Sequence, residues 1–84
     1  MPHDIALAKH MLTVLNRMPE KTPMREATFF AEVETQAGRP LTTQSCRDCA
    51  LALIGFKWLR ADNDEFRQPG YSITQAGRER LKSL

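Results

Sequence analysis

Apolar residues recur at the spacing of an α-helix in three separate stretches, and polar residues fill the positions between them. The first stretch predicts an amphipathic helix from Asp4 to Met18. Its apolar stripe consists of Ile5, Ala8, Leu12 and Leu15, flanked by Leu7, Met11 and Val14. Pro19 ends this helix, and the PEKTP segment that begins there is a connector that could hold a very short strand.

A second and a third helix are predicted on either side of a tight turn. The second runs from about residue 24 or 25 to Ala37, and its apolar face consists of Ala27, Phe30, Val33 and Ala37, with Phe29 beside them. Gly38 suits the left-handed conformation in which helices commonly stop, and Pro40 prevents the helix from resuming. Thr42 or Thr43 can then cap a third helix that runs to about residue 54, and Gly55 ends it.

The last third of the sequence changes to the spacing of strands. The strand-forming residues on either side of the polar stretch RADNDEFRQPG are Phe56, Trp58, Leu59, Tyr71 and Ile73. This pattern predicts a β-hairpin with a long tip. In the stretch YSITQAGRERL, the apolar neighbours of Ser72 mark a strand with one buried face, and Thr74 suits the N-cap of a short terminal helix.

The composition indicates a globular protein but does not indicate its function. The chain has 84 residues, of which 42% are hydrophobic and 26% are charged, and this is ordinary usage for one globular domain. No stretch approaches the roughly 18 apolar residues of a membrane span, and the N-terminus lacks a secretory pattern, so we expect a cytoplasmic protein. The net charge of +2 neither requires nor excludes nucleic acid, because the distribution of charge decides. No catalytic triad, glycine-rich phosphate loop or carboxylate pair stands out, and we expect no enzyme activity.

The two cysteines have the spacing of a CxxC motif. Cys46 and Cys49 share a face of the predicted third helix with Ala50 and Leu53, which favours packing in the core. A redox CxxC would open a helix after a strand, and a zinc site would need two further ligands. His3 and His10 alone could offer nitrogen, so we interpret them as surface residues and predict no metal and no cofactor.

This order of elements resembles the winged helix-turn-helix family of small bacterial DNA-binding regulators over nearly the whole chain. The residues that carry the resemblance are Cys46, Ala50 and Leu53, the GFKWL segment, and YSITQAGRERL, which is similar to the aromatic-x-apolar-Thr-x-x-Gly ending of many such regulators. The resemblance implies an α+β, mainly α fold in one domain spanning 1–84. A three-helix core would carry a helix-turn-helix at about 25–54, a β-hairpin wing at about 56–73 and a short C-terminal helix.

The resemblance also implies that the third helix reads DNA in the major groove. If the thiols face inward, the outward arc holds Gln44, Ser45, Arg47, Asp48 and Leu51. Gln44 can pair with adenine and Arg47 with guanine. Thr42 and Thr43 stand at the helix N-terminus, where hydroxyls and free backbone N–H groups can contact phosphate. The alternative is that these polar residues only solvate a surface helix.

The expected wing carries charges of both signs. Arg60 and Arg67 flank its tip and could contact phosphates, as could Arg39 in the turn. The carboxylates between them would repel phosphate or pair internally with the arginines, and these are Asp62, Asp64 and Glu65. A second basic cluster either contacts phosphate or matches the dipole of the last helix, and it consists of Arg78, Arg80 and Lys82. Trp58 is interpreted as a core or wing anchor rather than a base-stacking platform.

These patterns predict a transcriptional regulator that binds double-stranded DNA. The predicted contacts are Arg39, Thr42, Thr43, Gln44, Ser45, Arg47, Arg60 and Arg67. Because one such module makes few contacts, we expect a homodimer joined through the first or the last helix. The alternative is a winged helix that binds a protein partner, which Asp48, Leu51 and the acidic second helix favour. A continuous positive band from Arg39 through Arg47 to the wing would favour DNA.

Overall fold

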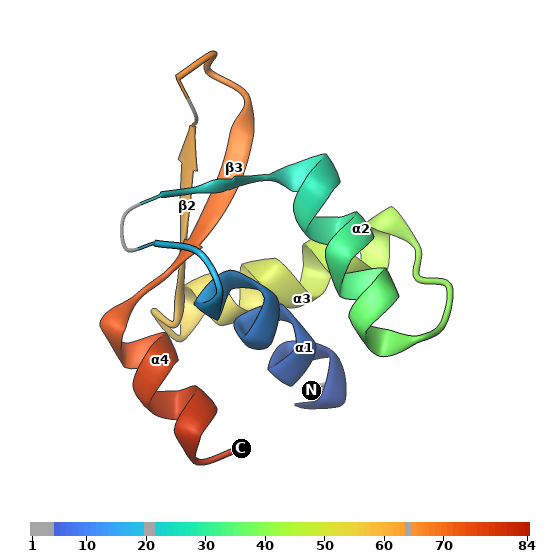
Figure 1. The fold of residues 1–84 in the computed structure, drawn as a ribbon, viewed down its shortest axis with the longest axis vertical. Helices are drawn as coiled ribbons and strands as arrows, with labels where there is room; N and C mark the ends of the chain where they lie inside the picture. Colours follow the sequence, from blue (N-terminus) through green and yellow to red (C-terminus); the bar gives the residue numbers. More distant parts are fainter. Residues whose placement is uncertain (1–4, 20–21, 64) are drawn as a thin grey trace.

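In the computed structural model, which describes residues 5–19, 22–63 and 65–84, four helices gather at one end of a three-stranded antiparallel sheet (Figure 1). The elements in chain order are α1 (Ile5–Asn16), β1 (Met24–Arg25), α2 (Glu26–Ala37), α3 (Thr43–Gly55), β2 (Leu59–Asn63), β3 (Pro69–Ile73) and α4 (Gln75–Lys82). Helices α2 and α3 form the helix-turn-helix, and the β2–β3 hairpin projects away from the helices as the wing (Figure 1). The predicted α+β, mainly helical architecture is confirmed.

Helix α1 lies at the centre of the fold, where it packs against α2, α3, α4 and β3. Because neighbours surround it, a broad face is buried, and that face consists of Leu7, Met11, Leu12, Val14 and Leu15. The prediction that Ile5 belongs to the buried stripe is wrong, since Ile5 is the first residue of the helix and is 66% exposed.

The buried face of α2 is also displaced from the prediction. Phe29 and Val33 are fully buried, Phe30 is only partly buried, and Ala27 is exposed. The ring of Phe29 packs at a tilt against that of Tyr71 in β3, with ring centroids 5.3 Å apart, so the buried face of α2 is directed toward β3. With α1, these side chains form one core that also contains Cys46, Ala50, Leu53, Leu59 and Ile73.

Strand β3 is the central strand, with β1 on one side and β2 on the other. Its pairing with β2 runs from Leu59 opposite Ile73 to Asn63 opposite Pro69. The predicted tip was therefore too long, because residues 60–63 and 69–70 belong to the strands. The short strand anticipated in the PEKTP connector forms just beyond it, where Met24 pairs with Tyr71.

Helix α3 ends at Gly55, as predicted, and a turn follows it. In this turn Lys57 takes the left-handed conformation, with a φ of 66°. The Trp58 N–H donates to the Leu53 carbonyl over 3.0 Å and the Lys57 N–H to Ile54 over 2.9 Å, which is the Schellman pattern of helix termination. Phe56 and Trp58 therefore belong to this turn, and the prediction that the wing strand begins at residue 56 is wrong.

The start of α4 is bonded to this turn through Thr74. Its hydroxyl accepts from the Gly77 N–H at 3.0 Å and donates to the Lys57 carbonyl at 2.7 Å, which confirms it as the N-cap. Its own N–H donates to the Trp58 carbonyl at 3.0 Å. Gly77 lies directly against that carbonyl, where a Cβ atom would collide with the Trp58 oxygen and with Ile73. The Thr-x-x-Gly ending thus joins the last helix to the base of the wing.

Gly77→Ala should destabilise the fold by at least about 2 kcal/mol, because the added methyl group meets backbone rather than a movable side chain. The matched control is Gly55→Ala in α3, where nothing lies within 4 Å of the added methyl group. That substitution should stabilise the fold by about 0.5–1 kcal/mol. Urea unfolding followed by tryptophan fluorescence measures both variants, and equal effects would contradict the close approach at Gly77.

Candidate nucleic-acid interface

The turn between α2 and α3 fixes how the candidate reading helix begins. Gly38 ends α2 with a φ of 71°, as predicted. The Glu34 carboxylate then accepts from the Leu41 N–H at 2.8 Å, which holds the turn against α2. Thr42 is the N-cap of α3, since its hydroxyl accepts from the Ser45 N–H at 3.0 Å. That hydroxyl also donates to the Ser45 Oγ at 2.8 Å, so both hydrogen bonds of the Thr42 side chain stabilise the start of α3.

Helix α3 exposes the side chains that sequence reasoning placed on its outer arc. Cys46, Ala50 and Leu53 are buried beneath it, and Gln44 and Arg47 face solvent. Both of these polar side chains are held by a carboxylate. Gln44 donates from Nε2 to Asp48 Oδ1 over 2.7 Å, and Arg47 donates from Nη2 to Glu26 Oε1 over 2.8 Å.

The Glu26 carboxylate joins three elements at the edge of this surface. It belongs to the first residue of α2 and accepts from Arg47 of α3 with one oxygen and from the Tyr71 hydroxyl of β3, at 2.7 Å, with the other. These two hydrogen bonds, that from Arg47 first, lower the pKa of Glu26 against the opposing effect of burial. Its carboxylate is therefore negatively charged at neutral pH and neutralises Arg47.

The arginines predicted to contact phosphate are exposed but do not form an uninterrupted positive band. On the wing, Arg60 donates from Nε to Asp62 Oδ2 over 3.2 Å, which is the internal pairing considered for the acidic tip. Arg67 is exposed at the hairpin turn with a φ of 61°, and Arg39 is exposed after α2. Arg47 and Arg60 thus each pair with a carboxylate, which interrupts the positive band expected along this surface. Asp64, predicted at the wing tip, lies outside the described residues.

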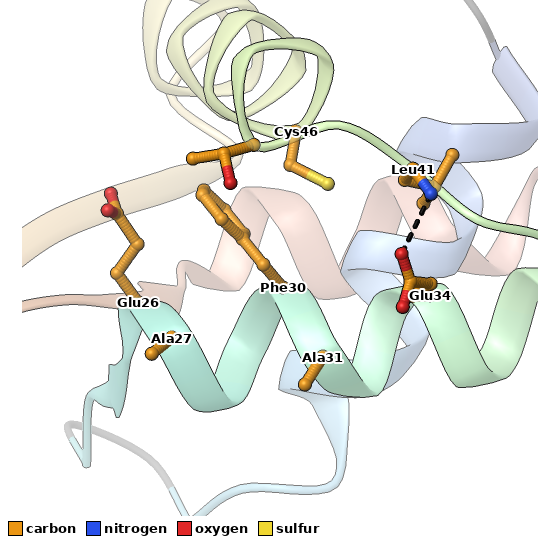
Figure 2. A pocket seen from close by; sticks show the side chains of 8 residues that line it. Glu26, Ala27, Phe30, Ala31, Glu34, Leu41 and Cys46 are labelled. Atoms are coloured by element: carbon orange, nitrogen blue, oxygen red, sulfur yellow. Dashed lines mark hydrogen bonds between the residues drawn. The ribbon is translucent and has the colours of Figure 1, made fainter.

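A groove of about 360 Å³ lies between α2 and the beginning of α3 (Figure 2). Figure 2 shows Phe30 rising from α2 toward α3, with Glu26 and Glu34 on either side of it along the helix. The remaining lining residues are Ala27, Ala31, Leu41, Thr43 and Cys46. The carboxylates of Glu26 and Glu34 already accept hydrogen bonds from other groups of the chain. The surface of the groove between them is apolar.

The cysteines pack as the sequence predicted. Cys46 is buried and Cys49 is partly buried, and both are free thiols. Burial, aided by the negative charge of Glu34, raises the pKa of Cys46 and keeps its thiol protonated at neutral pH. Within residues 5–19, 22–63 and 65–84, no group of three or more His, Cys, Asp and Glu side chains could hold a metal ion. His3 lies outside the described residues.

The basic cluster of α4 is engaged in the fold. Arg78 donates to the Asn16 carbonyl and side-chain oxygen, at 3.3 and 2.7 Å, and to the Met18 carbonyl at 3.2 Å. These bonds satisfy carbonyls that α1 leaves open at its C-terminal end. Arg80 lies 5.3 Å above the ring of Trp58, which packs partly buried against the core and stacks on Phe56. Trp58 is thus an anchor at the base of the wing, as its sequence context indicated.

The fold is that of a winged-helix protein. A solved structure with a similar fold is a transcriptional regulator of the MarR family from Silicibacter pomeroyi, with a TM-score of 0.69 and 18% sequence identity. The superposition covers 92% of this chain and 49% of that regulator, so this chain spans about half its length. No protein-family model and no curated protein matches the sequence. Among the residues that the structure describes, no helix has the length and apolar character needed to cross a bilayer.

Sequence reasoning missed Glu26 because its partners are far along the chain. Arg47 is 21 residues away and Tyr71 is 45 residues away, so no local spacing connects them. The Gln44–Asp48 pair, by contrast, has the i to i+4 spacing of neighbours on one helix face and could have been read from the sequence.

Tyr71 offers a direct test of the Glu26 cluster, because it is the single tyrosine of the sequence. Burial first, and then the hydrogen bond to Glu26, raise the pKa of Tyr71 from 10.0 to about 12. Absorbance of the phenolate should therefore show a midpoint near 12 in the folded chain and near 10 in denaturant. The folded chain keeps this proton where the unfolded chain loses it, so the associated stability is present below pH 10 and is lost toward pH 12.

Glu26→Gln should lower the Tyr71 midpoint, because the acceptor loses its charge. The matched control is Glu34→Gln, which removes a carboxylate of α2 that does not contact Tyr71 and should leave the midpoint unchanged. A native midpoint near 10 would contradict the contact between Tyr71 and Glu26.

Proposed function

We propose that this chain binds double-stranded DNA, with α3 in the major groove and the β2–β3 hairpin beside it, and acts in the regulation of transcription. The observation that carries this proposal is that α3 packs Cys46, Ala50 and Leu53 inward and thereby turns Gln44 and Arg47 toward solvent. An amide and a guanidinium on the exposed half of such a helix are the groups that pair with adenine and guanine. The likeness in fold to a transcriptional regulator supports the same function.

Contacts with phosphate would fix the orientation of α3. The proposed groups are Arg39, Thr43 and Ser45 with the first backbone N–H groups of α3, followed by Arg60 and Arg67 on the wing. Thr42 contributes by capping α3 and so exposing that helix end. The partner would be DNA in the cytoplasm, and the proposed function needs no cofactor, metal or catalytic group.

Binding to a duplex of random sequence should weaken as salt increases. With Arg47 and Arg60 paired to carboxylates, we expect two to four phosphate contacts and a slope of log affinity against log salt between about −2 and −4. Fluorescence anisotropy of a labelled duplex between low and physiological salt measures the slope. No binding at the lowest salt would overturn the proposal.

Arg67→Gln should weaken binding to all duplex sequences by a similar factor and make the salt slope shallower by about 1, as expected for one lost phosphate contact. The matched control is Lys82→Gln, which removes the same charge from the exposed end of α4, at the far end of the molecule from the wing (Figure 1). If both variants weaken binding equally, net charge rather than the wing determines affinity.

A winged helix that binds a protein is the second candidate function. Leu51 is 60% exposed in the middle of the outer arc of α3, and the polar side chains beside it are held by carboxylates. An apolar residue in a neutralised surface suits a protein partner. Absence of duplex binding at low salt, together with an intact fold, would select this candidate.

We further propose a homodimer, because a single module makes few DNA contacts. Helix α1 presents the exposed Ile5 at its start, and α4 carries the partly buried Leu81, with Leu84 just beyond its end, so either helix could supply apolar contact. Sedimentation velocity at tens of micromolar should then show a dimer. A monomer with and without DNA would contradict this expectation.

A further inference from the structure

The position of the Arg47 guanidinium is set by Glu26. One N–H of its Nη2 is bonded to Glu26 Oε1 at 2.8 Å, and this bond uses one of the five N–H donors of the group. The Arg47 side chain remains 46% exposed, whereas the Glu26 side chain is only 18% exposed. The carboxylate is therefore the sheltered partner of this pair, and the guanidinium faces outward.

Glu26 is itself held in place from two directions. The Tyr71 hydroxyl, on a residue that is only 7% exposed, donates to its second oxygen at 2.7 Å. Glu26 is also the first residue of α2, where the helix dipole favours an anion. A carboxylate fixed in this way reduces the conformational freedom that Arg47 would lose on binding a base.

The charge of this pair matters as much as its geometry. A free guanidinium attracts phosphates of any sequence and adds to general affinity. A guanidinium neutralised by an adjacent carboxylate contributes less of this attraction, while its remaining donors can still form directional hydrogen bonds with a base edge. Arg47 is thus placed to distinguish sequences rather than to attract DNA in general.

We propose that Glu26 is a positioning residue that fixes Arg47 for a base contact, so that Arg47 supplies sequence discrimination and little general affinity. The inference rests on the proposed DNA binding. It assigns to the first residue of α2 a role in specificity although Glu26 itself need not contact DNA.

The test begins with selection of a preferred duplex from a random pool. Affinities for this duplex and for a scrambled one are then measured at several salt concentrations. Glu26→Gln should reduce the ratio of the two affinities by about 10-fold, the loss of one well-formed base contact. The same variant should bind the scrambled duplex more tightly, with a salt slope steeper by about 1, because the released guanidinium reaches phosphate.

Glu34→Gln is the control for charge alone. It removes the same negative charge from α2 but contacts the Leu41 N–H and not Arg47, so the affinity ratio should remain that of the wild type. Arg47→Lys is the second variant, since it keeps the positive charge and loses the planar fork. It should lower the affinity ratio about as far as Glu26→Gln, and it provides the test if Glu26→Gln does not fold.

The outcomes separate this inference from the proposed function. A wild-type chain that binds neither duplex at low salt overturns both. Wild-type discrimination that survives in Glu26→Gln or in Arg47→Lys overturns the positioning role alone. An equal gain of affinity for both duplexes in Glu26→Gln also overturns it, because the carboxylate would then only repel DNA.

Discussion

The ion pair between Glu26 and Arg47, completed by the Tyr71 hydroxyl, connects the outer surface of α3 to the rest of the molecule. It joins the first turn of α2, the exposed side of α3 and the central strand in one hydrogen-bonded cluster. The apolar core beneath sets which face of α3 is buried, through Cys46, Ala50 and Leu53. The cluster adds the directional contact at the outer surface, where rotation of α3 would change which side chains meet a partner.

The electrostatics of the surface follow from the same cluster. The net charge of the chain is only +2. Among the arginines expected to form a continuous positive band, Arg47 and Arg60 are paired with carboxylates. Affinity for DNA would then depend on a few exposed cations and on the helix N-terminus, while directional contacts provide selectivity. The exposed Leu51, by contrast, is the feature of this surface that would suit the protein partner of the second candidate function.

Local patterns in the sequence predicted the elements well, since the end of α2 at Gly38, the cap at Thr42 and the cap at Thr74 each depend on a few neighbouring residues. The errors arose where distant contacts decide. Ile5 is apolar but lies beyond the core, and Phe56 and Trp58 lie in a turn before the strand, where the carbonyls of Lys57 and Trp58 are bonded to Thr74. The contacts of Glu26 could not be predicted from the sequence for the same reason, since its partners Arg47 and Tyr71 lie 21 and 45 residues away.

The bonds around Thr74 and Arg78 have a mechanical consequence. Thr74 ties the last helix to the carbonyls at the root of the hairpin, and Arg78 ties it to the end of α1. The wing root, the terminal helix and the central helix are consequently connected by one series of hydrogen bonds that runs through α4. A displacement of α4 would therefore strain the bonds at the root of the hairpin and at the end of α1 together.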